Sequence, residues 1–353
     1  MQPPSPLTLL LLRACFDRDA LADLRAWEAA VDIEDHDADA HGLLPLLKYS
    51  ADTYGWTLQH EGRIGGVYRF WWTRNMLALR ALAAVFDVFQ SEQIEVMALD
   101  DAALAIGAYA RPALRPIERL TLLIHPEQQQ AAYQALQNAG WIAHGWIPKR
   151  RQPYIESLGF TGQEQLHLTL RWFALDRRCA PHIDDGLWQC AVQQPTLNDR
   201  RIRIPSPSDQ LVLRAARLPI VWATTGPSLQ LADVITLIQT GEIDWEQVVG
   251  RVSDYRLTQP FLKLLTSACA LVSLPVPDQV ITQLSAPHRS WIAAAESAAF
   301  ENDLPLPAWQ SHLIRWWRST DGLPSARRMS SGAHYVRRWF NLPVPRFLRV
   351  KPQ

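Results

Sequence analysis

The sequence predicts an α+β fold, in which a small mixed β-sheet is flanked by N-terminal and C-terminal helical subdomains. Apolar segments with the length and alternation of strands are confined to one central region. On both sides of that region, apolar residues recur at the spacing of amphipathic helices. We therefore expect helical subdomains at 1–90 and 205–308, an α/β core at 91–204, and a separate basic, aromatic-rich segment at 309–353.

Helical periodicity is clearest from Val67 to Gln90, where charged residues separate apolar ones and predict a long amphipathic helix. A second helix start is predicted at 43–47, with Pro45 in its first turn. On the C-terminal side, we expect helices at 210–218 and 229–239, followed by a helix capped by Asp244.

Four strands are predicted in the core, at 94–99, 119–125, 141–147 and 164–172. Between the second and third strands, a helix is expected at 126–139, because proline stands at its start and Gly140 follows its end.

The composition describes a folded globular chain. Of 353 residues, 48% are hydrophobic and 20% are charged, which excludes a disordered chain. The formal net charge is zero, so nucleic acid is not an expected partner. No segment approaches the length of a membrane span, so we expect no membrane insertion and a cytoplasmic location. The four cysteines lack C-x-x-C spacing and are expected to be buried thiols rather than metal ligands or disulfides.

One stretch, from Ile94 to His125, is more informative than the rest. Its first apolar strand runs into Asp100 and Asp101 and then into a short alanine-rich helix. A loop containing Arg115-Pro116 follows, and a second apolar strand begins near residue 119.

This arrangement resembles the family usually called uncharacterised nucleotidyltransferases, within the polymerase-β-type nucleotidyltransferase superfamily. In that family the first strand ends in Lys-Gly, and the loop reads Arg-Pro-x-x-Asp-x-Asp. Here the Lys-Gly positions are Asp100 and Asp101, and the two aspartate positions are Arg119 and Thr121. The family's third acidic position lies in a Glu-Leu-His strand, which corresponds to Gln165-Leu166-His167.

Three later elements extend the resemblance to roughly residues 7–285. They are a Leu-Trp segment (Leu187-Trp188), a helix segment that contains Asp233 (Leu229–Val234) and an Asp-Trp helix start (Asp244-Trp245). No single motif among them is specific, but their common order and spacing are.

Nucleotidyl transfer requires two magnesium ions held by carboxylates, and the family pattern places two of these at i and i+2 on one strand face. In this chain Arg119 is a cation, Thr121 is neutral and Gln165 is an amide, while Glu164 would point to the opposite face of a regular strand. We therefore predict a catalytically degenerate nucleotidyltransferase-like protein with no metal and no cofactor, which binds a partner or a nucleotide-like ligand. Its degenerate pocket positions are Arg115, Arg119, Thr121, Gln165 and His167.

An alternative keeps the activity with displaced carboxylates. Asp100, Asp101 and Glu118 would then hold Mg²⁺ and a nucleoside triphosphate, and the enzyme would modify a small molecule, sugar or peptide. Two further interpretations compete with that alternative. One of the aspartates caps the following helix, or Arg119 pairs with Asp100 or Asp101 and closes a former metal site with an ion pair. His167 is read as an ordinary strand histidine rather than a catalyst.

The segment 309–353 interleaves aromatic residues with nine basic ones, opposed only by Asp321. Such a composition fits packing against acidic faces of the same chain, docking of a protein partner, or contact with nucleic acid. Among partners, a protein is the one expected from this segment.

Overall fold

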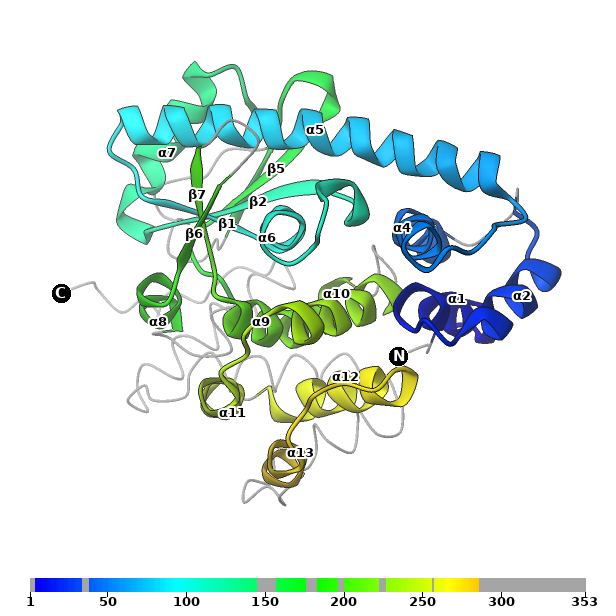
Figure 1. Cartoon of the computed structure of the whole chain (residues 1–353). Coiled ribbons are helices and arrows are strands. Elements are labelled where there is room, and N and C mark those ends of the chain that lie inside the picture. Colours follow the sequence, from blue (N-terminus) through cyan, green and yellow to red (C-terminus); the bar gives the residue numbers. More distant parts are fainter. Residues whose placement is uncertain are drawn as a thin grey trace, which may run out of the picture. The chain divides into compact units, whose positions relative to one another are not determined.

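The computed structural model describes residues 4–33, 38–144, 157–175, 183–195, 200–221, 227–255 and 257–285. The described residues of Met1–Ala174 and Ile183–Ala286 belong to one compact unit (Figure 1). The segment 309–353 lies outside the described residues, so its predicted roles stay predictions.

The predicted α+β class is confirmed, with helices on both sequence flanks of a small mixed sheet. The N-terminal helices are α1 (Pro6–Phe16), α2 (Leu21–Ala30), α3 (Ala38–His41), α4 (Leu44–Tyr54) and α5 (Glu61–Ser91). Within the core, the helices are α6 (Asp100–Gly107), α7 (Gln129–Asn138) and α8 (Ile183–Gln189). The C-terminal helices are α9 (Pro207–Val221), α10 (Pro227–Thr240), α11 (Trp245–Asp254), α12 (Thr258–Leu271) and α13 (Asp278–Leu284).

The main sheet has the order β1-β2-β5-β4-β3. Its strands are β1 (Val96–Leu99), β2 (Arg119–Ile124), β3 (Ile142–Ala143), β4 (Ser157–Thr161) and β5 (His167–Arg171). Strands β2 and β5 are parallel, and the other neighbours are antiparallel, so the sheet is mixed as predicted. A separate hairpin, β6 (Val192–Pro195) and β7 (Arg201–Ile204), contacts β1 through β7.

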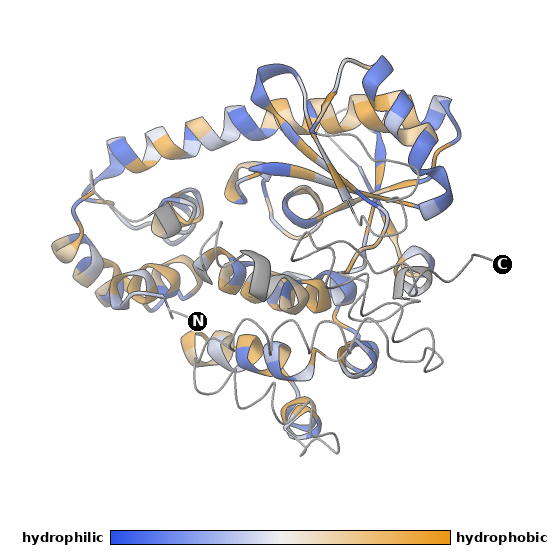
Figure 2. Cartoon of the chain, turned by 180° about the vertical axis from the view of Figure 1, so that it is seen from behind, coloured by the Kyte–Doolittle hydropathy of each residue, from blue (hydrophilic) through white to orange (hydrophobic). Residues whose placement is uncertain are grey.

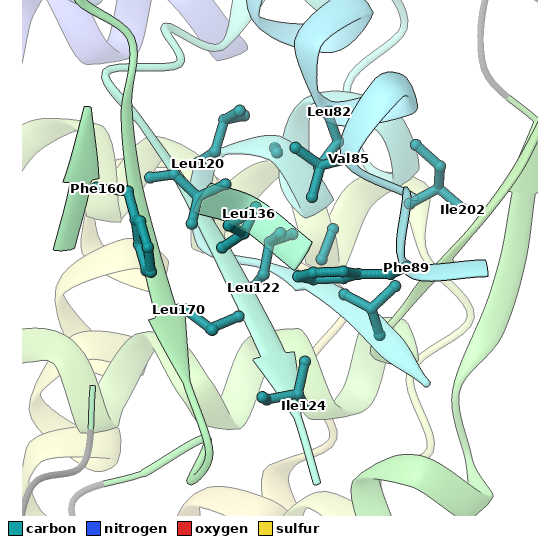
Figure 3. Packing of buried hydrophobic residues seen from close by; sticks show 14 of the residues in the cluster. Leu82, Val85, Phe89, Leu120, Leu122, Ile124, Leu136, Phe160, Leu170 and Ile202 are labelled. Carbon is teal, nitrogen blue, oxygen red and sulfur yellow. The ribbon is translucent and has the colours of Figure 1, made fainter. Parts of the chain in front are cut away.

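Alternation along the strands buries one face of the sheet under α5 and α7. Leu120, Leu122 and Ile124 of β2 lie on this face together with Phe89 of α5 and Leu136 of α7 (Figure 3). These side chains are at most 1% exposed. The long helix α5 is amphipathic, as predicted, with polar and apolar residues alternating along its length (Figure 2). Because the odd-numbered residues of β2 point the other way, Arg119 and Thr121 lie on the opposite face.

Two predictions about the ends of helices are confirmed. Asp244 caps α11, where its carboxylate accepts a hydrogen bond from the Gln247 amide at 3.0 Å. Gly140, just after α7, has φ 85°, the left-handed conformation that glycine adopts at least cost. No helix in the described ranges is long and apolar enough to cross a membrane.

The expectation that the cysteines are buried holds for Cys15 but is wrong elsewhere. Cys190 is exposed and Cys269 is partly exposed. Both lie at or near the end of a helix, where one side remains in contact with water. Cys179 lies outside the described residues.

Candidate functional site

The two aspartates that follow β1 form the first turn of α6. Asp100 is the first residue of this helix and Leu99 is its N-cap, so neither aspartate occupies the cap position that one interpretation gave them. Asp100 has φ 54°, a left-handed conformation that aspartate tolerates better than most residues. The side chains of Asp100 and Asp101 are 17% and 15% exposed. Carboxylates buried to this degree need cationic or hydrogen-bonding partners.

Arg115, in the loop before β2, is the partner of Asp101. Its guanidinium donates a hydrogen bond from Nη2 to Asp101 Oδ1 at 3.0 Å. The same group reaches Asp233 on α10, from Nε to Oδ1 at 2.7 Å and from Nη2 to Oδ2 at 3.1 Å. A last bond runs from Nη1 to the Pro116 carbonyl oxygen at 2.6 Å. Such two-point pairing matches the planar fork of an arginine to a carboxylate.

Arg214 on α9 is the partner of Asp100, with Nη2 at 2.7 Å from Asp100 Oδ1. Its Nη1 lies 3.5 Å from Asp233 Oδ2, so Asp233 contacts two arginines. The Tyr109 hydroxyl adds a hydrogen bond to Asp233 Oδ1 at 2.8 Å. We refer to these six residues as the buried ion-pair network: Asp100, Asp101, Tyr109, Arg115, Arg214 and Asp233.

Asn75 of α5 fixes the backbone of the Arg115 loop. Its side-chain amide donates hydrogen bonds to the carbonyl oxygens of Pro112 at 2.6 Å and Arg115 at 2.9 Å. Its Oδ1 accepts a bond from the Ile117 amide at 3.0 Å. Asn75 is fully buried, and its bonds to Arg115 and Ile117 are made out of water, whereas the bond to Pro112 is partly buried. The long helix therefore holds the loop that presents Arg115 to the network.

Burial and the neighbouring charges of opposite sign shift the pKa values of the network residues in opposite directions. Burial raises the pKa of Asp101 above its ordinary value, and the neighbouring Asp100 adds to this rise while Arg115 opposes it. For Arg115, burial disfavours the charged form, but Asp233 and Asp101 outweigh it and hold the pKa above its usual range. Burial and Asp233 raise the pKa of Tyr109, so its hydroxyl remains a donor.

Arg119 and Thr121 occupy the two positions where the family pattern has aspartates. Arg119 is exposed at the start of β2, and Thr121 is 6% exposed. In the register of β2 and β5, Arg119 lies beside His167 and Thr121 beside Thr169. The predicted ion pair between Arg119 and one of the aspartates is wrong, because among the described residues the cations paired with Asp100 and Asp101 are Arg214 and Arg115. The prediction overlooked an arginine on a helix more than 110 residues downstream.

The strand expected at 164–172 begins three residues later, at His167. Gln163–Gln165 form a 3₁₀ turn, in which Glu164 and Gln165 both have positive φ, of 56° and 58°. The prediction that Glu164 points to the opposite sheet face is therefore wrong, because the residue is not in a strand. This turn connects β4, a strand that was not predicted, to β5, with the Gly162 amide bonded to the Leu166 carbonyl at 2.8 Å. Thus Gln165 lies outside the strands, and His167 is an exposed strand residue, as expected.

Glu118, the third displaced carboxylate, precedes β2. Glu118 is an exposed residue, but partial desolvation of its carboxyl raises its pKa. The proximity of Asp101 raises this pKa further, against the opposing effects of Arg115, Arg74 and Arg119. Across the ranges that the structure covers, however, no three His, Cys, Asp or Glu side chains converge as a metal-binding group. Asp100 and Asp101 instead turn toward arginines. The residues present thus do not fit the divalent metal site that a transfer reaction requires.

Three members of this arrangement were missed by sequence reasoning. Arg214 interrupts an otherwise apolar helical stretch, and Asn75 lies among the apolar residues of α5. Tyr109 follows the alanine-rich helix. Buried polar residues of this kind need partners, but the sequence does not say which ones. Asp233 belongs to a predicted helix motif, but the motif assigned it no role in the site.

The order of these elements agrees with a known family. The sequence profile described as "Uncharacterised nucleotidyltransferase" matches residues 27–273, more than half of the chain. The chain belongs to this family. All six residues of the buried ion-pair network lie within the matched part of this nucleotidyltransferase-family protein. No curated protein matches the sequence.

Two solved structures are similar to parts of the chain. One is the lincosamide antibiotic adenylyltransferase LnuA with lincomycin bound, at 15% identity and a TM-score of 0.26, covering 38% of this chain and 83% of that one. The other is an antigenic nucleotidyltransferase-like protein from Paracoccidioides brasiliensis, at 16% identity and a TM-score of 0.33, covering 65% of this chain and 94% of that one. Membership of the family rests on the sequence profile and not on these two likenesses.

Proposed function

We propose that this nucleotidyltransferase-family protein does not transfer nucleotides, and that it acts by binding a partner or a nucleotide-like ligand. The observation that carries the proposal is the state of Asp100 and Asp101. These acids stand where the family pattern has Lys-Gly, and both are held by buried arginines.

The position that would hold a triphosphate has the wrong charge. A phosphate chain is favoured by a lysine or by backbone amides at a glycine turn. Asp100 and Asp101 repel phosphate, and the positive charges near them, on Arg115 and Arg214, are shared with Asp233. A triphosphate at this place would have to displace carboxylates from pairs that are already made.

The position that would hold the metal ions has also changed. Arg119 repels a divalent cation, and the Thr121 hydroxyl is a weak replacement for a carboxylate. On the neighbouring strand, the residues beside these two are His167 and Thr169. No pair of carboxylate ligands at i and i+2 remains on β2, a strand that the structure describes in full.

The alternative, an active transferase that uses Asp100, Asp101 and Glu118, would require the network to open. Releasing Asp101 from Arg115, or Asp100 from Arg214, would leave buried charges without partners, at a cost of about 3–5 kcal/mol for each pair. A metal ion would have to compensate for this cost. The ion pairs of Asp100, Asp101 and Asp233 with Arg115 and Arg214 therefore favour a closed network over a displaced metal site.

Binding of a protein partner through 309–353 is part of the proposal on sequence grounds, since arginines and aromatic residues alternate there with a single acidic residue, Asp321, among them. The expected partner surface is acidic, because a basic segment gains most from opposite charge.

Calorimetric titration of the full-length chain with Mg²⁺ and with Mn²⁺ tests the metal half of the proposal. We expect no site in the micromolar range for either ion. A micromolar site that is lost in Asp101→Ala and kept in Glu127→Ala, a carboxylate in the exposed turn before α7, would contradict the proposal.

A further inference from the structure

On the side of the sheet opposite α5 and α7, β2, β5 and β4 carry polar side chains in two successive rows, and the row after these has the buried Leu123 of β2. In the first row, Arg119 of β2 lies beside His167 of β5, which lies beside Thr161 of β4. In the next row, Thr121 lies beside Thr169. We refer to these five residues as the polar sheet face: Arg119, Thr121, Thr161, His167 and Thr169.

This polar sheet face is open to solvent over β4 and β5. Arg119 and His167 are exposed, Thr161 and Thr169 are partly exposed, and only Thr121 is buried. By contrast, the even-numbered residues of β2 and β5 are almost fully buried on the other side. The polar residues therefore form a surface and are not a lining of the core.

The chemistry of this surface is that of hydrogen-bond donors. Arginine contributes five N–H donors and a fixed positive charge, and hydroxyls and imidazoles donate as well. Arg119 forms no ion pair within the described part of the chain. No described strand residue on this face is acidic. The strand residues of this face thus carry positive and no negative charge, beside the β2 positions where the family pattern has two aspartates. Glu118, just before β2, is an acidic neighbour whose pKa Arg119 lowers.

A second histidine extends the row of donors beyond β4. His144, directly after β3, places Nε2 2.5 Å from Thr161 Oγ1, and Thr161 Oγ1 lies 3.4 Å from His167 Nδ1. The His144 ring can lie over this strand because Gly159 has no side chain. A Cβ there would come within 3.3 Å of His144 Nδ1. Thr161 thus lies between two imidazoles whose ring centres are 6.3 Å apart.

We infer that the polar sheet face binds the phosphoryl group of a ligand without a divalent metal ion. This inference rests on the proposed function, because it assigns a ligand class to the site that has lost its metal carboxylates. In a metal-dependent site, cations bridge acidic side chains and phosphate oxygens. With Arg119 in place of an acid, the protein supplies the positive charge itself. The guanidinium can then contact phosphate oxygens directly, with His167 and the threonine hydroxyls as further donors.

The test is calorimetric titration of the full-length chain at about 0.15 M ionic strength, where the Debye length is about 8 Å. It is run once with EDTA and once with Mg²⁺, using pyrophosphate, ATP and adenosine as probes. The variant is Arg119→Glu, which reverses the charge on the polar sheet face. Its matched control is Arg80→Glu, an exposed arginine on α5, the helix that covers the opposite face of the sheet.

In EDTA, we expect pyrophosphate and ATP to bind, and Arg119→Glu to weaken both by about tenfold or more, since a charge-assisted contact is replaced by repulsion. Arg80→Glu should bind within about twofold of the unmodified chain, because surface charges beyond a Debye length are screened. Equal affinity for pyrophosphate and ATP would assign recognition to the phosphoryl groups alone. Tighter binding of ATP, still lost in Arg119→Glu, would assign the phosphoryl group to a nucleotide.

Three results would overturn the inference: no binding of either phosphate in EDTA, equal affinities in Arg119→Glu and the unmodified chain, or adenosine binding as tightly as ATP. The experiments distinguish a failure of this inference from a failure of the proposed function. A chain that binds no phosphate and releases no pyrophosphate from a triphosphate refutes only the phosphoryl site. Magnesium-dependent turnover would refute the proposed function as well.

Discussion

The guanidinium of Arg115 and the carboxylate of Asp233 form a two-point pair at 2.7 and 3.1 Å, although 118 residues separate them in the sequence. Arg115 is 3% exposed and Asp233 is fully buried. The pair joins the loop before β2 to α10, and therefore connects the sheet to the C-terminal helices. Both residues come from segments of the family resemblance, the Arg-Pro loop and the helix segment Leu229–Val234, and the pair brings these two segments together.

Replacing Arg115 by methionine should destabilise the chain by about 3–5 kcal/mol, because Asp233 and Asp101 would keep buried charges without their principal partner. Chemical unfolding of the full-length chain, followed by circular dichroism, measures this change.

A second variant separates pairing from packing. Arg115→Met combined with Asp233→Leu removes both charges and should regain more than half of the lost stability, since an apolar pair of similar volume can replace a buried ion pair. Strictly additive losses in the double variant would show that the two side chains do not depend on each other.

Asn75→Ala should cost about 2–4 kcal/mol. The change leaves the carbonyls of Pro112 and Arg115 and the amide of Ile117 without their buried partner, at about 1–3 kcal/mol for each group that water does not reach. The urea midpoint of unfolding gives the measurement. Thr73→Ala, two residues earlier on the exposed side of α5, is the control and should change stability by less than about 0.5 kcal/mol. A similar loss in both variants would mean that the Asn75 bonds contribute nothing beyond helix propensity.

The stability of the chain should depend on pH through Asp101 with a defined sign. Burial raises its pKa above the unfolded value, so the folded chain binds more protons between the two pKa values. The contribution of Asp101 to stability is therefore present at low pH and is lost as pH rises through the folded pKa. Asp101→Asn removes this titration. The melting temperature of the unmodified chain minus that of Asp101→Asn should thus fall as pH increases from about 4 to 7.

Glu95 serves as a control, because its contribution to stability should change with pH in the opposite direction to that of Asp101. A hydrogen bond to His125 and the nearby Arg203 lower its pKa, so its contribution is lost as pH falls through the folded pKa. The difference in melting temperature between the unmodified chain and Glu95→Gln should rise with pH over the same range, by a small amount because the group is exposed. If the Asp101 difference also rises with pH, its pair with Arg115 outweighs its burial, and the predicted sign for Asp101 is wrong.

The basic segment at 309–353 can be tested by truncation after residue 308. If the segment docks a partner, the truncated chain should keep its melting temperature within about 2 °C, a change below that of a typical single substitution. A fall of several degrees together with lost solubility would instead show that the segment packs against the rest of the chain.

The sequence allowed the fold class, the long helix α5, four of the five strands of the main sheet and the capping role of Asp244 to be predicted. These features depend on local periodicity and turn chemistry, which neighbouring residues determine. β4 was missed, because it lies beyond a long connection from β3, and its alternation is weakened by Gly159. Hairpin β6–β7 was missed as well; its strands have only four residues each.

The candidate site was predictable in part. That Asp100 and Asp101 lie at a strand end follows from the pattern of apolar residues. That Arg119 and Thr121 stand at positions where acids are expected follows from the family resemblance. The partners of the aspartates do not follow, because Arg214 and Asp233 come from helices brought close only by the tertiary fold. A charged residue in a predicted core must have a partner, but the identity of that partner depends on the tertiary packing.

The central claim, that the site has exchanged metal-dependent transfer for a closed network of its own charges, is tested most directly by pyrophosphate release. The full-length chain is incubated with Mg²⁺ or Mn²⁺ and each of the four ribonucleoside triphosphates, alongside Asp100→Ala and Asp101→Ala. We predict release at the buffer rate in every case, with no difference between the unmodified chain and either variant. Release above background that disappears in Asp100→Ala or Asp101→Ala would show that these carboxylates hold a catalytic metal, and would contradict the claim.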